Sequence, residues 1–75
     1  MKKEESKSTA FKRLAANRTN NAVKNIRLLG NLSNKHNYTY SDNDFKLIFN
    51  MIEDEVKLAK SRFLVGLSKK KRLKF

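Results

Sequence analysis

The sequence contains no cysteine, no proline, two glycines and a single histidine. Without cysteine it can form neither a disulfide nor a thiolate metal site, and His36 alone cannot supply a histidine cluster for a metal. A chain of 75 residues has room for only a small hydrophobic core. We therefore expect no metal and no cofactor, and stability that depends on oligomerisation or on a large partner.

Long apolar runs are also missing. No stretch approaches the ~20 apolar residues of a membrane-spanning helix. The first residues lack the apolar segment of a secretory signal. These absences predict no membrane partner and a cytoplasmic location.

Acidic residues are scarce and confined to a few places. Eighteen Lys and Arg stand against seven Asp and Glu, for a net charge of +11. Residues 6–41 and 56–75 contain basic residues and no acid, whereas residues 42–55 carry five acids and one lysine. Phosphate backbones are the commonest surface to neutralise such an excess, with anionic membranes and acidic proteins as competitors.

Hydrophobic periodicity predicts two helices. The first runs from about Ser8 to Leu29, with Ser8 or Thr9 as its N-cap and Gly30 just past its end. The second starts at Ser41, has acids in its first turn, and stops at Gly66. Residues 31–40 read as an ordered connector. The residues expected on the two apolar faces are Phe11, Leu14, Ala15, Ala22, Ile26 and Leu29, then Phe45, Ile48, Phe49, Ile52, Val56, Ala59 and Phe63.

This pattern predicts an all-α fold, an antiparallel helical hairpin over residues 8–67. A flexible polar head, residues 1–7, precedes it, and a basic tail, residues 68–75, follows it. Two hairpins are expected to associate into a four-helix bundle. Within the hairpin, Arg18 lies on the apolar face of the first helix and level with the acidic run. It is expected to form a structural ion pair with Glu53 or Glu55, with phosphate binding as the alternative.

The second helix carries another apolar stripe, opposite the first. One hairpin partner cannot cover both sides of a helix, so this stripe is expected to contact a second copy or another protein. Scattered exposed apolar residues are the ordinary alternative. The stripe consists of Leu47, Met51, Leu58 and Val65.

Basic residues on the far side of the first helix, in the connector and in the tail are the candidate nucleic-acid contacts. Arg and Lys bind phosphates, and the neighbouring asparagines can bind phosphates or base edges. A solvated helix face is the alternative, but no acids alternate with these bases to form pairs along the helix. The candidates are Lys12, Arg13, Lys24, Arg27, Lys35, Lys69, Lys70, Lys71, Arg72 and Lys74.

The connector places His36, Tyr38 and Tyr40 beside Lys35. Such aromatics can stack on unpaired bases, although tyrosines at a hairpin end more often pack against the helices. Catalysis has no support, because the carboxylates cluster at a helix start and only one histidine could act as a base. We expect a protein that is not an enzyme.

A run from Ile26 to Asn34, IRLLGNLSN, is followed by Asn37-Tyr38-Thr39-Tyr40, Ile48-Phe49 and Lys60-Ser61-Arg62-Phe63. Together these residues resemble small basic proteins of bacteria and their plasmids and phages. The resemblance covers residues 11–63 and implies a bacterial or mobile-element setting, with no mechanism.

The sequence therefore predicts a small basic helical protein that binds DNA or RNA mainly through the phosphate backbone. One alternative is a phage- or plasmid-type protein that binds and regulates or inhibits a larger nucleoprotein machine. Another is a ribosome-associated component.

Overall fold

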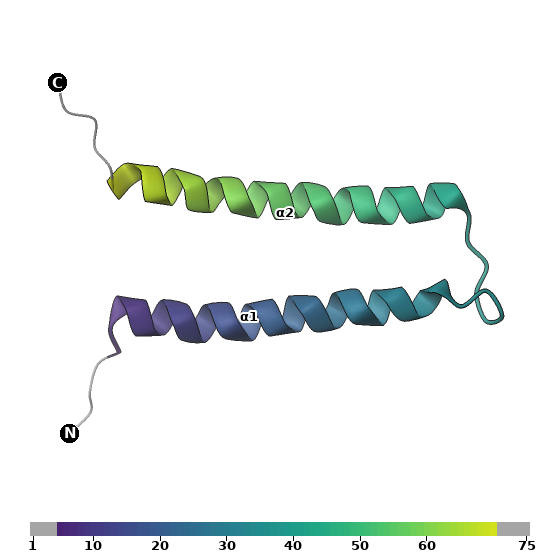
Figure 1. Ribbon diagram of the computed structural model, residues 1–75, viewed down its shortest axis with the longest axis horizontal. Coiled ribbons are helices and arrows are strands. Elements are labelled where there is room, and N and C mark those ends of the chain that lie inside the picture. Colours follow the sequence, from purple (N-terminus) through teal and green to yellow (C-terminus); the bar gives the residue numbers. More distant parts are fainter. Residues whose placement is uncertain (1–4, 71–75) are drawn as a thin grey trace. The chain divides into compact units, whose positions relative to one another are not determined.

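The part of the chain that can be described is entirely helical. The computed structural model describes the backbone of residues 5–70 and the side chains of residues 5–68. Helix α1 spans Lys7–Gly30, a short 3-10 helix η1 spans Asn31–Ser33, and helix α2 spans Asp42–Lys70 (Figure 1). No strand occurs among these residues, which confirms the all-α prediction.

The chain divides into two units, Met1–Thr39 and Tyr40–Phe75. The first contains α1 and η1, and the second contains α2. Each unit is described by itself below.

Helix α1 begins at a serine cap. Ser6 has extended backbone angles, and its Oγ accepts a hydrogen bond from the backbone N–H of Thr9 at 3.1 Å. The same Oγ donates to Oγ1 of Thr9 at 2.9 Å. The predicted caps Ser8 and Thr9 are therefore wrong, since both lie in the first turn. Ser6 caps the helix because its hydroxyl accepts from the N–H of Thr9. That N–H lies in the first turn, where no carbonyl of the helix is available as an acceptor.

The end of α1 does not use a left-handed glycine. Gly30 has φ −59° and ψ −28°, within the right-handed helical region. Asn31 is also right-handed, and its N–H reaches the carbonyls of Arg27, Leu28 and Leu29. The helix ends by tightening into η1, a common way to satisfy the last carbonyls. The helix thus ends at Gly30, one residue later than predicted, and Gly30 is its last residue instead of a left-handed residue past its end. No described residue has a positive φ.

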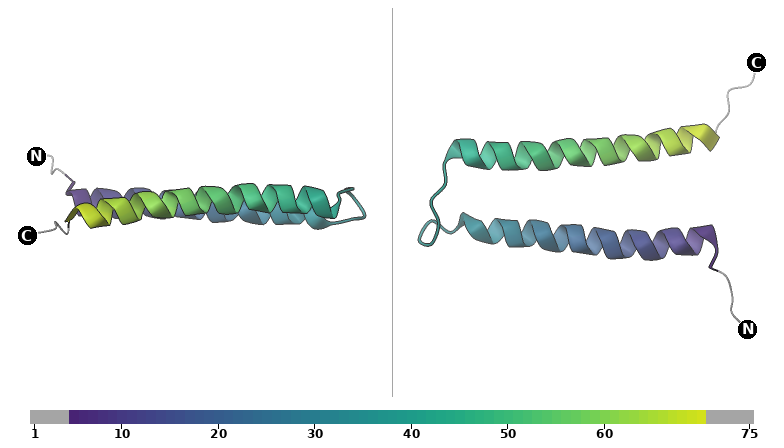
Figure 2. Two further views of the ribbon diagram at one scale, coloured as in Figure 1. Left: turned by 90° about the horizontal axis from the view of Figure 1, so that it is seen from above. Right: turned by 180° about the vertical axis from the view of Figure 1, so that it is seen from behind.

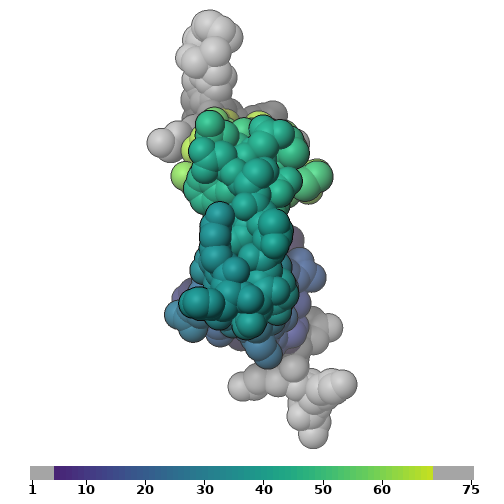
Figure 3. Space-filling model, turned by 90° about the vertical axis from the view of Figure 1, so that its right-hand side faces the viewer, coloured from purple at the N-terminus to yellow at the C-terminus, as the bar shows by residue number. Residues whose placement is uncertain are grey.

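A local turn follows η1 and orders the connector. The side chain of Asn34 accepts a hydrogen bond from the N–H of His36 at 2.9 Å. The carbonyl of Asn34 accepts from the N–H groups of Asn37 and Tyr38, at 3.1 and 3.0 Å. This is an Asx-type turn, in which the asparagine side chain replaces a backbone acceptor. The connector, drawn in teal, faces the viewer in Figure 3.

Helix α2 begins with a reciprocal capping box. Oγ of Ser41 accepts from the N–H of Asp44 at 3.1 Å, and Oδ2 of Asp44 accepts from the N–H of Ser41 at 2.9 Å. Asp42 and Asp44 lie in the first turn, where negative charge stabilises the positive end of the helix dipole. The predicted start of the second helix is confirmed.

The far end of α2 differs from the prediction. The helix continues through Gly66 to Lys70, and Figure 2 shows it as one uninterrupted rod. A helical glycine costs about 1 kcal/mol relative to alanine. That cost does not end a helix whose next residues, Leu67 to Lys70, include good helix formers and no proline. Gly66 is therefore not a stop, and residues 68–70 belong to α2.

The described side chains do not form a buried core. No residue among them is buried. The least exposed positions are Ala10, Ala15, Leu29, Tyr40, Phe49 and Ile52, all of intermediate exposure. No helix of the described part combines the length and apolarity needed to cross a membrane.

Candidate nucleic-acid interface

One face of α1 carries basic and amide side chains at helical spacing. Arg13, Asn17, Asn20, Lys24 and Arg27 follow one another at intervals of four and three residues, which places them on one side of the helix. All five are exposed. From Arg13 to Arg27 this basic face extends about 21 Å at 1.5 Å per residue. That length equals the rise of about six phosphates of one strand along the axis of a duplex, at ~3.4 Å per phosphate.

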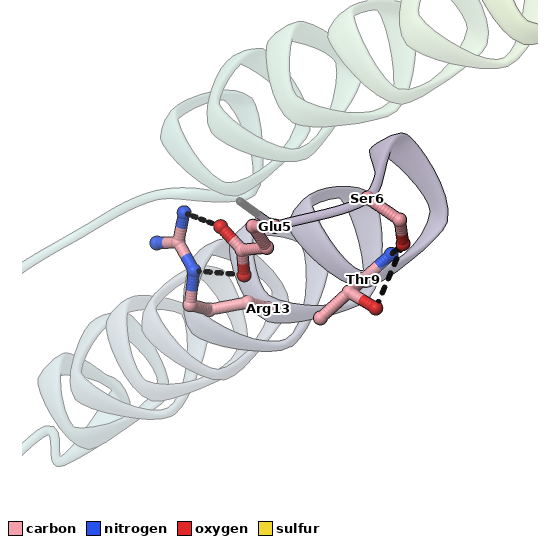
Figure 4. A network of polar contacts seen from close by, with 4 residues as sticks. All are labelled: Glu5, Ser6, Thr9 and Arg13. Atoms are coloured by element: carbon pink, nitrogen blue, oxygen red, sulfur yellow. Dashed lines mark hydrogen bonds and ion pairs between the residues drawn. The ribbon is translucent and has the colours of Figure 1, made fainter. Parts of the chain in front are cut away.

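Arg13, at the N-terminal end of the basic face, is held by an acid. Its Nε donates to Oε2 of Glu5 at 2.9 Å, and its Nη2 donates to Oε1 at 3.0 Å. Figure 4 shows the two side chains meeting in parallel beside the Ser6–Thr9 cap. This is the bidentate geometry that suits a guanidinium and a carboxylate. The Glu5 hydrogen bonds raise the pKa of Arg13 above its ordinary value.

The spacing rules for helices do not predict the Glu5–Arg13 pair, because they concern acids three or four residues away along the same helix. Glu5 lies outside α1, immediately before its cap. The extended backbone at Ser6 turns Glu5 back along the helix surface, so it reaches a residue two turns into α1. The available signal was an acid next to a possible cap, followed by an arginine two turns later.

The other predicted basic contacts are spread more widely. Lys12 lies on α1 next to the basic face, and Lys35 lies in the Asn34 turn. Both belong to the same unit as Lys24 and Arg27. Lys69 and Lys70 fall in the last turn of α2, but their side chains lie outside the described ones. Lys71, Arg72 and Lys74 lie outside the described residues altogether.

Arg18 is exposed on α1, and Glu53 and Glu55 are exposed on α2. The arginine and the two acids belong to different units. The ion pair predicted between them therefore stays a prediction.

The predicted partner interface lies on α2. Leu47 and Met51 are 64% and 76% exposed, and Leu58 and Val65 are both 57% exposed. These values are high for large apolar side chains. The four side chains are accessible to a partner in the described structure.

The described residues contain no group of three or more His, Cys, Asp and Glu that could hold a metal ion. No protein-family model, curated protein or solved structure matches the chain. The functional conclusion therefore depends on the residues of this chain alone.

Proposed function

We propose that this protein binds DNA or RNA without catalysing a reaction, and that it does so mainly through the phosphate backbone. The observation that carries the proposal is the basic face of α1. Lys24 and Arg27 stand exposed on it with neighbouring asparagines, and Glu5 is the only acid among the described residues of that unit. Each phosphate that such side chains neutralise releases a condensed counterion, which favours binding.

Charge distribution along the chain supports this assignment. The basic residues of the first unit are followed by an acidic segment, residues 42–55, and then by a second basic segment. A basic excess without local counter-charges attracts polyanions over distances of about a Debye length, ~10 Å at 0.1 M salt. The tail from Lys69 to Lys74 consists mainly of lysine and arginine, and we expect it to add further phosphate contacts.

The fold proposed for binding is the antiparallel hairpin of α1 and α2. Arg18 would face Glu53 or Glu55 across the two helices, and the basic face of α1 would remain turned outward. A cytoplasmic protein of this kind would meet nucleic acid directly.

Binding is tested by fluorescence anisotropy with labelled duplex DNA and single-stranded RNA over a series of salt concentrations. We expect the logarithm of the binding constant to fall linearly with the logarithm of salt. Lys24→Ala and Arg27→Ala are each expected to lower the slope by about 1.

Lys46→Ala is the matched control, because it removes the same charge from within the acidic segment of α2. It should leave the slope unchanged. If neither nucleic acid binds at low salt, the proposal is wrong. It is also wrong if Lys24→Ala and Arg27→Ala behave like Lys46→Ala.

A second candidate function is favoured by the exposed stripe of Leu47, Met51, Leu58 and Val65. Such a stripe suits a protein that docks on a larger nucleoprotein machine and regulates it. In that case the apolar stripe would determine activity, and the basic residues would direct the chain to the machine.

A further inference from the structure

Helix α2 carries a second, more regular apolar stripe. Its members alternate four and three residues apart, the spacing of helices that pair as coiled coils. Phe45 and Val56 within it are 52% and 46% exposed. We refer to it as the heptad stripe, and it consists of Phe45, Phe49, Ile52, Val56, Ala59, Phe63 and Gly66.

Charged residues border the heptad stripe on both sides. Glu53 and Glu55 flank it in the first half of α2, and Lys60 and Arg62 flank it in the second half. All four side chains are exposed, and none forms a salt bridge within the described part of the chain. The flanking charges are therefore acidic just before Val56 and basic just after it, while Lys46 flanks the stripe near its start.

We propose that α2 pairs antiparallel with α2 of a second copy of this chain, through the heptad stripe. An antiparallel arrangement lays the acidic half of each helix on the basic half of the other and opposes the two helix dipoles. In the register where Val56 faces Ala59 of the second copy, the flanking charges also match. Glu53 then lies beside Lys60 of the second copy, and Glu55 lies beside Arg62. The two-fold symmetry makes each of these pairs twice.

Side-chain sizes match in the same register. Phe49 faces Gly66 of the second copy, and Ile52 faces Phe63. A shallow hollow lies on α2 at Gly66, lined by Arg62, Phe63, Gly66 and Leu67. No atom lies within 4 Å of the place where a Cβ of Gly66 would sit. A phenylalanine ring from a second helix therefore has space at the one position of the stripe without a side chain.

Other antiparallel registers oppose like charges. A shift of seven residues in one direction sets Glu53 and Glu55 against their own copies, and a shift in the other direction does the same for Lys60 and Arg62. A parallel pair keeps the contact between Glu55 and Lys60 of the second copy, but it loses the other matched pairs and aligns the two helix dipoles. Like charges directly across an interface are destabilising and select against a register.

The opposite stripe, Leu47, Met51, Leu58 and Val65, is a poorer surface for a second copy. Asp54 and Ser61 interrupt it at the positions where a heptad pattern requires apolar side chains. The second copy is thus assigned to the heptad stripe. The stripe of Leu47, Met51, Leu58 and Val65, which was predicted as the partner interface, lies on the other face of α2. The heptad stripe contains most of the apolar face of α2 that the hairpin would turn toward α1. With hairpins closed in each chain, this stripe would lie at the centre of a four-helix bundle, shared between α1 and α2 of the second copy.

This inference stands independently of nucleic-acid binding, and its test needs no nucleic acid. Sedimentation equilibrium of the full chain is expected to show a dimer. Two charge-reversed variants are then compared, Glu53→Lys/Glu55→Arg and Lys60→Glu/Arg62→Glu. Each alone should dimerise at least about tenfold more weakly, because every flanking pair becomes repulsive. A 1:1 mixture should restore the affinity as a heterodimer, since opposite charges then face each other.

A monomer at all concentrations would overturn the proposal, as would unchanged dimerisation of both variants. Loss of helicity in the single variants does not prevent the test. Recovery of helicity on mixing, followed by circular dichroism, supports the pairing, and failure to recover contradicts it.

Helix direction is tested by cross-linking, because the chain has no cysteine and only introduced thiols can react. Phe49→Cys and Gly66→Cys chains are mixed and oxidised. Antiparallel pairing brings these two positions together and yields the mixed disulfide, which needs Cα atoms about 4.4–6.8 Å apart. Disulfides between identical variants would indicate parallel helices and refute the arrangement.

Discussion

Arg13 and Glu5 form a bidentate ion pair across the start of α1, with donor–acceptor distances of 2.9 and 3.0 Å. The pair ties the residue before the helix cap to the second turn of the helix. It also occupies two of the N–H donors that a phosphate would use. A polyanion should therefore bind most strongly at the end of the basic face that carries Lys24 and Arg27.

The first prediction concerns this competition. Glu5→Gln is expected to raise nucleic-acid affinity several-fold, because Arg13 no longer shares its guanidinium with a carboxylate. The effect should disappear in an Arg13→Ala background, as a double-mutant cycle would show. Anisotropy titrations at one fixed salt concentration measure both quantities.

Asp54→Asn is the control for that experiment, since it also removes one negative charge from the chain. It should raise the affinity less than Glu5→Gln does. Equal effects of the two variants would mean that net charge alone is responsible and that the pair does not restrain Arg13.

The second prediction concerns the start of α2. Ser41→Ala removes the acceptor for the N–H of Asp44 and should lower the free energy of unfolding by about 1 kcal/mol. Ser61→Ala is a suitable control, because the Ser61 hydroxyl bonds only to the carbonyl of Leu58 within the helix. Its effect is expected to stay within a few tenths of a kcal/mol. Thermal unfolding at constant protein concentration compares the two, and equal losses would contradict the importance of the cap.

The third prediction tests the conformation at Gly30. Because Gly30 is right-handed and a Cβ there would meet nothing within 4 Å, Gly30→Ala should stabilise the protein by about 0.4–1 kcal/mol. A left-handed glycine would give the opposite sign, a loss of about 1 kcal/mol or more. Denaturant unfolding decides between these outcomes.

The fourth prediction concerns Arg18. If it pairs with Glu53 or Glu55, Arg18→Met should lower the free energy of unfolding by up to about 1 kcal/mol and leave nucleic-acid affinity nearly unchanged. Unchanged or improved stability together with weaker binding would assign Arg18 to phosphate contact instead. Both properties are measured on the same purified variant.

The fifth prediction separates the two candidate functions. Met51→Glu and Leu58→Glu place charges on the opposite stripe and should lower the affinity for free nucleic acid no more than Lys46→Glu does, since all three add negative charge to α2. If the protein acts on a larger machine, the same variants should lose co-purification with it from nuclease-treated lysate. Lys46→Glu, a substitution away from this stripe, serves as the comparison.

Much of the fold could be predicted from the sequence. The alternation of apolar and polar residues predicts both helices, and Ser41 with Asp44 predicts the start of α2. These features are local, so neighbouring residues suffice to determine them. Ser6, Ser8 and Thr9 could each cap α1, and only the backbone geometry selects Ser6.

Two glycines and one acid were harder to interpret. Glycines favour helix ends statistically, but at Gly66 the neighbouring residues outweigh about 1 kcal/mol of glycine cost and α2 continues. Gly30 does end α1, but in a right-handed conformation. Glu5 reaches Arg13 because of the angle at which the chain enters α1, which residue spacing does not encode. Contacts between the two units depend on long-range packing, which local patterns do not determine.

The absence of buried side chains among the described residues has a consequence for the life of the protein. In the proposed hairpin and α2 pairing, the apolar side chains that each unit leaves exposed would become buried, so folding would be coupled to assembly. By mass action, each tenfold rise in the concentration of a saturating partner adds about 1.4 kcal/mol to stability. Copies that find no partner would open readily to proteases, so the abundance of the protein should follow that of its partner.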